Sequence, residues 1–190
     1  MKRIRIIGKN RSVENWQVSE LLGGVTTIGL NQAALVFPTD YAITAHQPVM
    51  RAFVRSGRKN LIACLPFVDG SSDGLSFDFR IGHKCGPTAN HEEDAFEAVV
   101  HGNSMHNYRA FWTVLHLAIW WAAIQIGRGG VIEIVGCELT PDSMTGFDHY
   151  RLPHQVQRMA GAKQFLAGQI LALEKQGVRA YQLSHDTSEN

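Results

Sequence analysis

The chain has 190 residues, 45% of them hydrophobic and 18% charged, and a formal net charge of +1. This length and composition predict one soluble globular domain spanning 1–190, and the near-neutral charge gives no general reason to expect nucleic acid as a partner. The amino terminus has no apolar segment typical of a signal peptide, and the three cysteines have no regular spacing. We therefore expect a reducing, cytoplasmic location and no membrane span.

The first twelve residues, MKRIRIIGKNRS, predict a strand, a tight turn and the start of a helix. Gly8 ends the isoleucine-rich strand, and Ser12 is typical of the N-cap of a helix that continues to about Leu22. In such a turn, backbone N–H groups and the positive end of the helix dipole point at one place. An ordinary first βα turn is the alternative, because no GxGxxG or GxxxxGK[ST] sequence occurs. We interpret the turn as the phosphate end of a nucleotide pocket, formed by Gly8, Lys9, Asn10, Arg11 and Ser12.

Further along the chain, predicted strands alternate with predicted helices. Apolar segments bounded by turn residues predict strands at 25–30, 41–45, 61–65, 75–81, 131–135 and 178–183. Helical patterns occur after Pro48 and at 90–100, 110–126 and 155–176. The alternation predicts an α/β fold: a single Rossmann-like domain with a mostly parallel sheet and helices on both faces.

The most apolar segment, Ala110–Ile126, is predicted to be a buried helix, because it is short for a bilayer span and contains polar residues. Trp112, Trp120 and Trp121 would cover more than one side of this helix. One face of one sheet would not hide them all, so we expect the helix to lie in the core or partly at an interface between copies of the chain.

Polar residues follow several of the predicted strands. In a parallel sheet, a ligand lies beyond the carboxyl ends of the strands, near a switch in strand order. Asn31 and His46 follow the second and third strands, Asn103 and Ser104 precede the apolar helix, and Glu138 follows the strand at 131–135. We therefore predict that Asn31, His46, Asn103 and Ser104 bind the nucleotide or its phosphate, because an amide suits a base edge or a ribose hydroxyl, and a helix start suits an anion. The alternative roles of these residues are turn formation and helix capping.

The segment 139–154 is rich in proline and glycine and is expected to form a short lid-like loop. Within it, His149 or His154 could accept a proton from an attacking hydroxyl, and Tyr150 or Arg151 could steady a leaving phosphate. We predict no metal site, because no pair of histidines has a recognised ligand spacing. No nucleophile elbow and no obvious nucleophilic cysteine occur.

Short segments spread over nearly the whole chain follow the order of a known enzyme family: IIGKNRSVENW, LNQ, DYAITAHQP, GNSM, VIEIVGCELT, HYRLPH and VRAYQLSHDTS. Together they resemble the family 42 sialyltransferases and the related MptE-like domains of the DUF115 group. The resemblance implies a Rossmann-like fold and a metal-independent transferase that uses a CMP-activated sugar and no further cofactor. By position, it implies that the nucleotide is held by Asn10, Asn31, Asn103 and Ser104, that His154 is the general base, and that Tyr150 assists the leaving phosphate.

The chain departs from the family at two places. Lys9 and Arg11 add charge where the family has none, and the segment before His154 is much shorter than the family's lid. Despite these departures, the function that the resemblance implies is a glycosyltransferase whose partners are a nucleotide sugar and a small or glycan acceptor. One alternative is a nucleotide-dependent phospho- or diphosphotransferase of the MptE-like type, because the added positive charge would suit a triphosphate. Another is a nucleotide-binding module without activity, and the basic amino terminus leaves a nucleic-acid acceptor open.

Overall fold

A computed structural model describes residues 2–65, 67, 69–82, 113–139 and 155–184, with the backbone alone for Arg11 and for residues 155–159. The strands are β1 (Arg3–Ile7), β2 (Thr26–Leu30), β3 (Tyr41–Thr44), β4 (Leu61–Leu65), β5 (Phe79–Gly82), β6 (Val131–Val135) and β7 (Arg179–Gln182). The helices are the 3₁₀ helix η1 (Arg11–Asn15), α1 (Val18–Leu22), α2 (Ala33–Val36), α3 (Gln47–Arg55), α6 (Val114–Ile126) and α7 (Gln155–Lys175).

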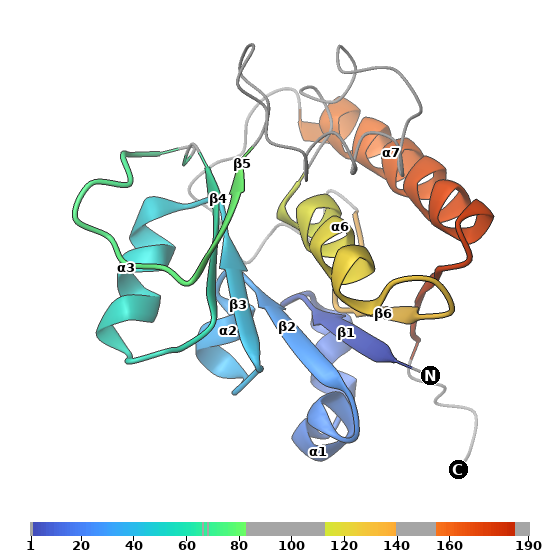
Figure 1. Cartoon of the computed structure of the whole chain (residues 1–190), viewed down its shortest axis with the longest axis horizontal. Coiled ribbons are helices and arrows are strands. Elements are labelled where there is room, and N and C mark those ends of the chain that lie inside the picture. The colour runs from blue at the N-terminus through green and yellow to red at the C-terminus, as the bar shows by residue number, and fades with distance from the viewer. Residues whose placement is uncertain (1, 66, 68, 83–112, 140–154, 185–190) are drawn as a thin grey trace.

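All seven strands among the described residues belong to one parallel sheet with helices on both faces (Figure 1). The order is β5-β4-β3-β2-β1-β6-β7. From β1 the chain adds β2 to β5 in one direction, and then it returns to add β6 and β7 on the other side of β1. The order therefore reverses between β1 and β6, where α/β sheets bind their ligands. The predicted α/β, Rossmann-like fold is confirmed.

One face of the sheet lies under α6 and α7 (Figure 1). The β-branched residues Ile6, Ile28 and Ile132 pack there, each fully buried. Trp120 and Trp121 are also buried, at 4% and 8% exposure, so the prediction of a buried apolar helix is confirmed. Its N-cap is Thr113, and residues 110–112 lie outside the described part of the chain. No helix among the described residues is long and apolar enough to cross a membrane.

The opposite face is covered by the short helices α1, α2 and α3 (Figure 1). Met50 and Phe53 of α3 are fully buried against β4. The predicted strand at 75–81 is shorter in the structure and begins at Phe79. Leu75 and Phe77, just before it, pack instead against the cluster that contains Met50 and Phe53.

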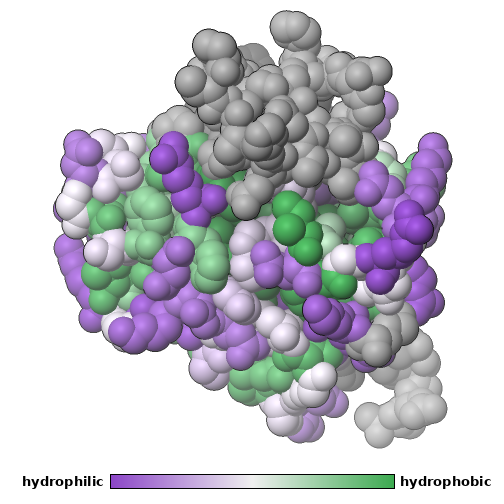
Figure 2. All heavy atoms as spheres, in the orientation of Figure 1, coloured by the Kyte–Doolittle hydropathy of each residue, from purple (hydrophilic) through white to green (hydrophobic). Residues whose placement is uncertain are grey.

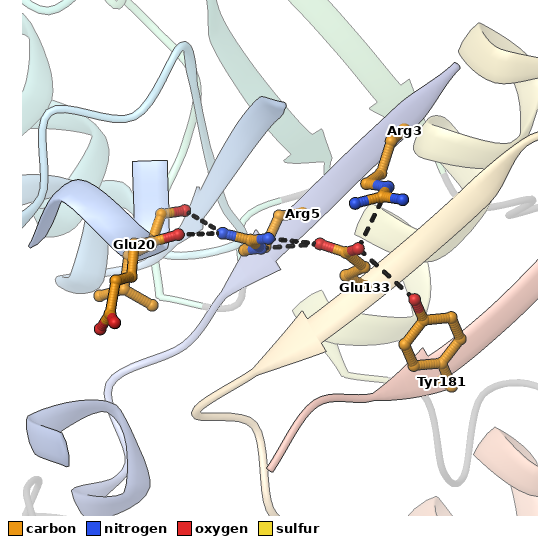
Figure 3. Close-up of polar contacts among 6 residues, drawn as sticks. Arg3, Arg5, Glu20, Glu133 and Tyr181 are labelled. Carbon is orange, nitrogen blue, oxygen red and sulfur yellow. Dashed lines mark hydrogen bonds and ion pairs between the residues drawn. The ribbon is translucent and has the colours of Figure 1, made fainter. Parts of the chain in front are cut away.

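The same face holds a buried ion pair between neighbouring strands. Nε and Nη2 of Arg5 in β1 donate to Oε2 of Glu133 in β6, at 2.9 and 2.6 Å. Nη1 of Arg5 donates to the carbonyl oxygens of Glu20 and Leu21 near the end of α1. Figure 3 shows Arg5 between these carbonyls and Glu133, with Arg3 and Tyr181 on the other side of the carboxylate. The pair fixes α1 to the sheet.

The prediction of one helix from Ser12 to Leu22 is wrong. The structure has η1 and then α1, separated by extended backbone at Trp16 and Gln17. Gln17 begins a new helix, because its backbone N–H donates to the carboxylate of Glu20 at 2.8 Å in a capping box. Ser12 is not an N-cap, because it lies inside η1, whose N-cap is Asn10, and its hydroxyl donates to the carboxylate of Glu138.

Candidate functional site

The polar residues that the sequence analysis predicted to follow the strands lie at the carboxyl ends of those strands. The turn Gly8–Ser12 follows β1, Asn31 follows β2, and His46 follows β3. Glu138 follows β6, at the other side of the strand-order reversal. Because all strands are parallel, these segments lie along one edge of the sheet. Two groups of contacts can be distinguished on this edge, one at β1 and β6 and one at β2, β3 and β4.

At the strand-order reversal, the backbone turns after β1 and β6 touch. The N–H of Gly8 donates to the carbonyl of Val135 at 2.8 Å, and the N–H of Asn10 donates to that of Gly136 at 3.1 Å. A Cβ atom on Gly8 would lie 1.9 Å from the carbonyl oxygen of Gly136. Gly136 itself has a φ of 64°, in the left-handed region that favours glycine. Both positions therefore need glycine for the turns to meet.

Two side chains of the β1 turn also bind the segment after β6. The Asn10 Nδ2 group donates to the backbone carbonyl of Glu138 at 2.8 Å, and the Ser12 hydroxyl donates to the Glu138 carboxylate. Asn10 and Ser12, which the sequence predicts to bind a nucleotide, thus have partners within the protein. Their contacts make the Glu138 segment part of the site. Lys9 lies in the same turn, and partial burial lowers its pKa.

Asn31 has the turn role that was the alternative to nucleotide binding. Its φ is 50°, a left-handed conformation that asparagine tolerates better than most residues. Its Oδ1 accepts a hydrogen bond from the Thr44 hydroxyl at 2.8 Å, and its backbone N–H donates to Ile43 at 2.9 Å. Asn31 therefore links the ends of β2 and β3, and its role as a nucleotide ligand stays a prediction.

His46 forms a pair with a residue that sequence reasoning missed. Its Nδ1 lies 3.0 Å from Oδ2 of Asp69, in the loop after β4. The other carboxylate oxygen, Oδ1, accepts the backbone N–H of Gln47 at 2.8 Å. The segment Asp69–Gly74 has the composition of a surface loop, which conceals this role. The signal that could have found Asp69 is its position a few residues beyond β4, since β3 and β4 are parallel neighbours.

The hydrogen bond fixes the tautomer of the neutral ring. An ionised carboxylate only accepts hydrogen bonds, so Nδ1 of His46 carries the proton and Nε2 carries the lone pair. The side chains of His46 and Asp69 are 43% and 35% exposed. The pair is therefore accessible to a ligand at the edge of the sheet.

Other candidate groups have structural roles. His116 in α6 is fully buried, with Nδ1 accepting the N–H of Thr113 at 2.8 Å and Nε2 contacting the carbonyl of Ala162 in α7 at 3.1 Å. Burial raises the pKa of the Cys64 and Cys137 thiols well above the usual range, which disfavours the nucleophilic thiolate. Among the described residues, no group of three or more histidine, cysteine or acidic side chains could hold a metal ion.

The remaining predicted site residues, Asn103, Ser104, Tyr150 and His154, lie outside the described residues, as does nearly all of the lid-like segment 139–154. Their assigned roles stay predictions. Comparison of the chain with protein-family models, with curated proteins and with solved structures finds no match.

Proposed function

We propose that the protein is a transferase that binds a nucleotide sugar at the carboxyl edge of its sheet and moves the sugar to a hydroxyl acceptor. The proposal rests on the arrangement of polar residues at the carboxyl edge of the sheet. The strand order reverses between β1 and β6, and polar side chains from Asn10, Ser12, Asn31, His46 and Glu138 follow the strands on both sides of that point. Open α/β sheets bind nucleotides at such a reversal.

The proposed reaction is a direct displacement. The acceptor hydroxyl loses its proton to a histidine and attacks the anomeric carbon, while the bond from that carbon to the nucleotide phosphate breaks. The departing phosphate gains negative charge, which a cation held in a partly buried position stabilises. The lysine in the turn after β1, Lys9, is partly buried and is our candidate for this cation. The reaction needs neither a metal ion nor another cofactor, and the resemblance adds Tyr150 as the residue that assists the leaving phosphate.

The same lysine favours the second candidate, a phospho- or diphosphotransferase of the MptE-like type. A polyphosphate carries more charge than the single phosphate of a CMP-sugar, and its transfer usually requires Mg²⁺. The two candidates therefore differ in their metal dependence.

A thermal-shift screen with CMP, UDP, GDP and ATP, each with and without Mg²⁺, tests the proposal. A nucleotide at a hundred times its dissociation constant stabilises a protein by about 2.7 kcal/mol. Stabilisation by CMP or UDP without Mg²⁺ supports sugar transfer, whereas stabilisation by ATP only with Mg²⁺ supports the second candidate. If none of the four nucleotides shifts the transition, the nucleotide-binding proposal is contradicted.

A further inference from the structure

The His46–Asp69 pair has the geometry of an oriented base. In the neutral ring, Nδ1 donates to the Asp69 carboxylate at 3.0 Å, which leaves the lone pair on Nε2. An imidazole that accepts a proton at Nε2 becomes a cation, and a carboxylate at Nδ1 stabilises that cation while it holds the ring in place. The pair belongs to the described part of the edge, whereas His154, the base implied by the resemblance, lies outside it.

The orientation of the pair is set by the ends of three neighbouring strands. The backbone N–H of His46 donates to the Thr44 hydroxyl at 3.0 Å, and that hydroxyl donates to Asn31 after β2 at 2.8 Å. Asp69, after β4, is fixed through its second oxygen by the Gln47 N–H at the start of α3. Thr44 is fully buried, so the backbone under the ring is anchored in the core.

If Asp69 only stabilised the fold, it would not need its hydrogen bond to His46. The Gln47 N–H alone is enough to tie Asp69 to the start of α3, and the Gln47 side chain adds a second tie by donating to the carbonyl of Ser71 at 2.6 Å. An ion pair between two side chains as exposed as His46 and Asp69 adds little stability. The second carboxylate oxygen thus does little for the fold but determines which ring nitrogen can accept a proton.

The position of the pair suits a reaction centre next to the proposed phosphate site. His46 follows β3, which is two strands from β1 in the sheet. Neighbouring strands are about 4.8 Å apart, so the two strand ends are separated by about 10 Å. The reacting groups would form a line: the phosphate, the anomeric carbon, the attacking oxygen and the base. This line is also about 10 Å long, because reacting atoms meet at about 3 to 3.5 Å and a base reaches its proton at about 3 Å.

We propose that His46, oriented by Asp69, is the catalytic base for the acceptor hydroxyl, an inference that rests on the proposed sugar transfer. The O–H proton passes to Nε2 of His46, the oxygen forms the new bond to the anomeric carbon, and the carbon–oxygen bond to phosphate breaks with its electron pair on the phosphate. The imidazolium then returns its proton to water. His46 is the catalytic residue and Asp69 is a positioning residue.

The test measures nucleotide release from CMP-N-acetylneuraminate, UDP-glucose and GDP-mannose, with water as the acceptor, by the full-length protein. The variants are His46→Gln, Asp69→Asn and the control Asp73→Asn, which lies in the same loop and contacts Ser71 rather than His46. We expect His46→Gln to lower kcat about a hundredfold or more and Asp69→Asn at least about tenfold, with KM for the donor within about twofold. Asp73→Asn should keep the wild-type rate.

A second measurement reports on the ring itself. Nitrogen-15 NMR of the histidine side chains should show the Nδ1–H tautomer for neutral His46, lost in Asp69→Asn and kept in Asp73→Asn. A role of Asp69 in folding alone would leave kcat unchanged once each variant is shown to be folded by its thermal transition.

The outcomes separate the two proposals. If the wild-type protein releases nucleotide but His46→Gln retains its kcat, the base is elsewhere and only this inference is overturned; a loss in His154→Ala measured in parallel would identify the other base. If the wild-type protein releases no nucleotide from any of the three donors, the proposed sugar transfer fails and the assignment of His46 falls with it.

Discussion

At the scale of single residues, the Arg5–Glu133 pair places two opposite charges inside the fold. The two side chains are 9% and 3% exposed, so both charges are removed from water. The cost is offset because Arg5 also binds the end of α1, and Arg3 approaches the other oxygen of Glu133 at 3.2 Å. Such pairs contribute little net stability while both partners are present, but a single partner left alone is a buried, unpaired charge.

Glu133→Gln should therefore lower the free energy of unfolding by about 3 kcal/mol or more, because it leaves Arg5 buried without its counter-charge. Urea denaturation measures the effect. Arg3→Gln is the matched control, since the Arg3 side chain is 49% exposed and its loss should cost less than about 1 kcal/mol. Equal effects of the two substitutions would show that Glu133 is not paired as the structure describes.

The two buried cysteines predict a loss of stability at alkaline pH. Burial raises the pKa of Cys64 and Cys137, and for Cys137 the charge of Glu138 raises it further. The unfolded thiols lose their protons above about pH 8.5, whereas the folded thiols keep them. The free energy of unfolding should fall from that pH upward by about 1.4 kcal/mol per pH unit for each cysteine. In Cys64→Ala, urea unfolding at several pH values should show a shallower fall, and an unchanged slope would contradict the assignment.

Lys9→Ala tests the phosphate role of the turn after β1. Lys9 is held partly buried at the strand end, where burial strengthens its attraction to an anion. Calorimetric titration with the nucleotide selected by the thermal-shift screen should show affinity reduced about tenfold, a typical loss for one charge-assisted hydrogen bond. The exposed Lys59→Ala is the control and should leave affinity unchanged. Equal affinities of the wild type and Lys9→Ala would remove the turn from the site.

At the scale of elements, α7 contains an interior glycine with no evident purpose. A Cβ atom on Gly168 would meet nothing within 4 Å. Gly168→Ala should therefore raise the free energy of unfolding by about 0.5 to 1 kcal/mol, because alanine loses less backbone entropy in a helix. Gly177→Ala, just after the helix, should do the opposite, since Gly177 has a φ of 79°. Thermal unfolding of both variants tests whether Gly168→Ala stabilises the protein and Gly177→Ala destabilises it. Destabilisation by Gly168→Ala would contradict the described packing.

The elements that the sequence predicted correctly are those whose hydrophobic pattern decides their structure. The helix α6 and the strand β6 at Val131–Val135 bury nearly every residue, so their apolar composition, together with segment length and the flanking glycines, identifies them. The prediction of one helix from Ser12 to Leu22 was wrong because long-range contacts override the local sequence pattern. Glu138 binds Ser12, and Arg5 binds the carbonyls that end α1. The capping box at Gln17 and Glu20 was the one local signal of the interruption.

The site was predictable to the extent that strand order determines it. Parallel strands bring Asn31, His46 and Glu138 to one edge, which follows from the alternation of strands and helices. The pairing of His46 with Asp69 does not follow from the alternation of strands and helices alone. It depends on a loop that carries no periodic pattern, and on β3 and β4 being neighbours in the sheet.

At the scale of the whole molecule, the tryptophans of α6 connect distant parts of the fold. Trp121 packs against Tyr41 of β3 and Phe79 of the edge strand β5, with ring centroids 4.6 and 5.8 Å apart. The described chain itself buries Trp120 and Trp121, which removes them as an exposed apolar surface. The face shown in Figure 2 mixes hydrophobic with hydrophilic residues. Self-association of the chain stays a prediction, but the burial of Trp120 and Trp121 means that these two residues do not support it.

Trp121→Ala should therefore act on folding and not on assembly. Removing a large buried aromatic side chain leaves a cavity and costs about 3 to 5 kcal/mol, so urea unfolding should shift strongly. The mass measured by light scattering should stay that of the wild type, whatever that mass is, because Trp121 faces β3 and β5 of its own chain. Ile124→Ala on the same helix is the control: its side chain is exposed, and its loss should cost less than about 1 kcal/mol. If Trp121→Ala instead kept its stability and converted an oligomer to a monomer, the tryptophan would be an interface residue and its place in the core would be wrong.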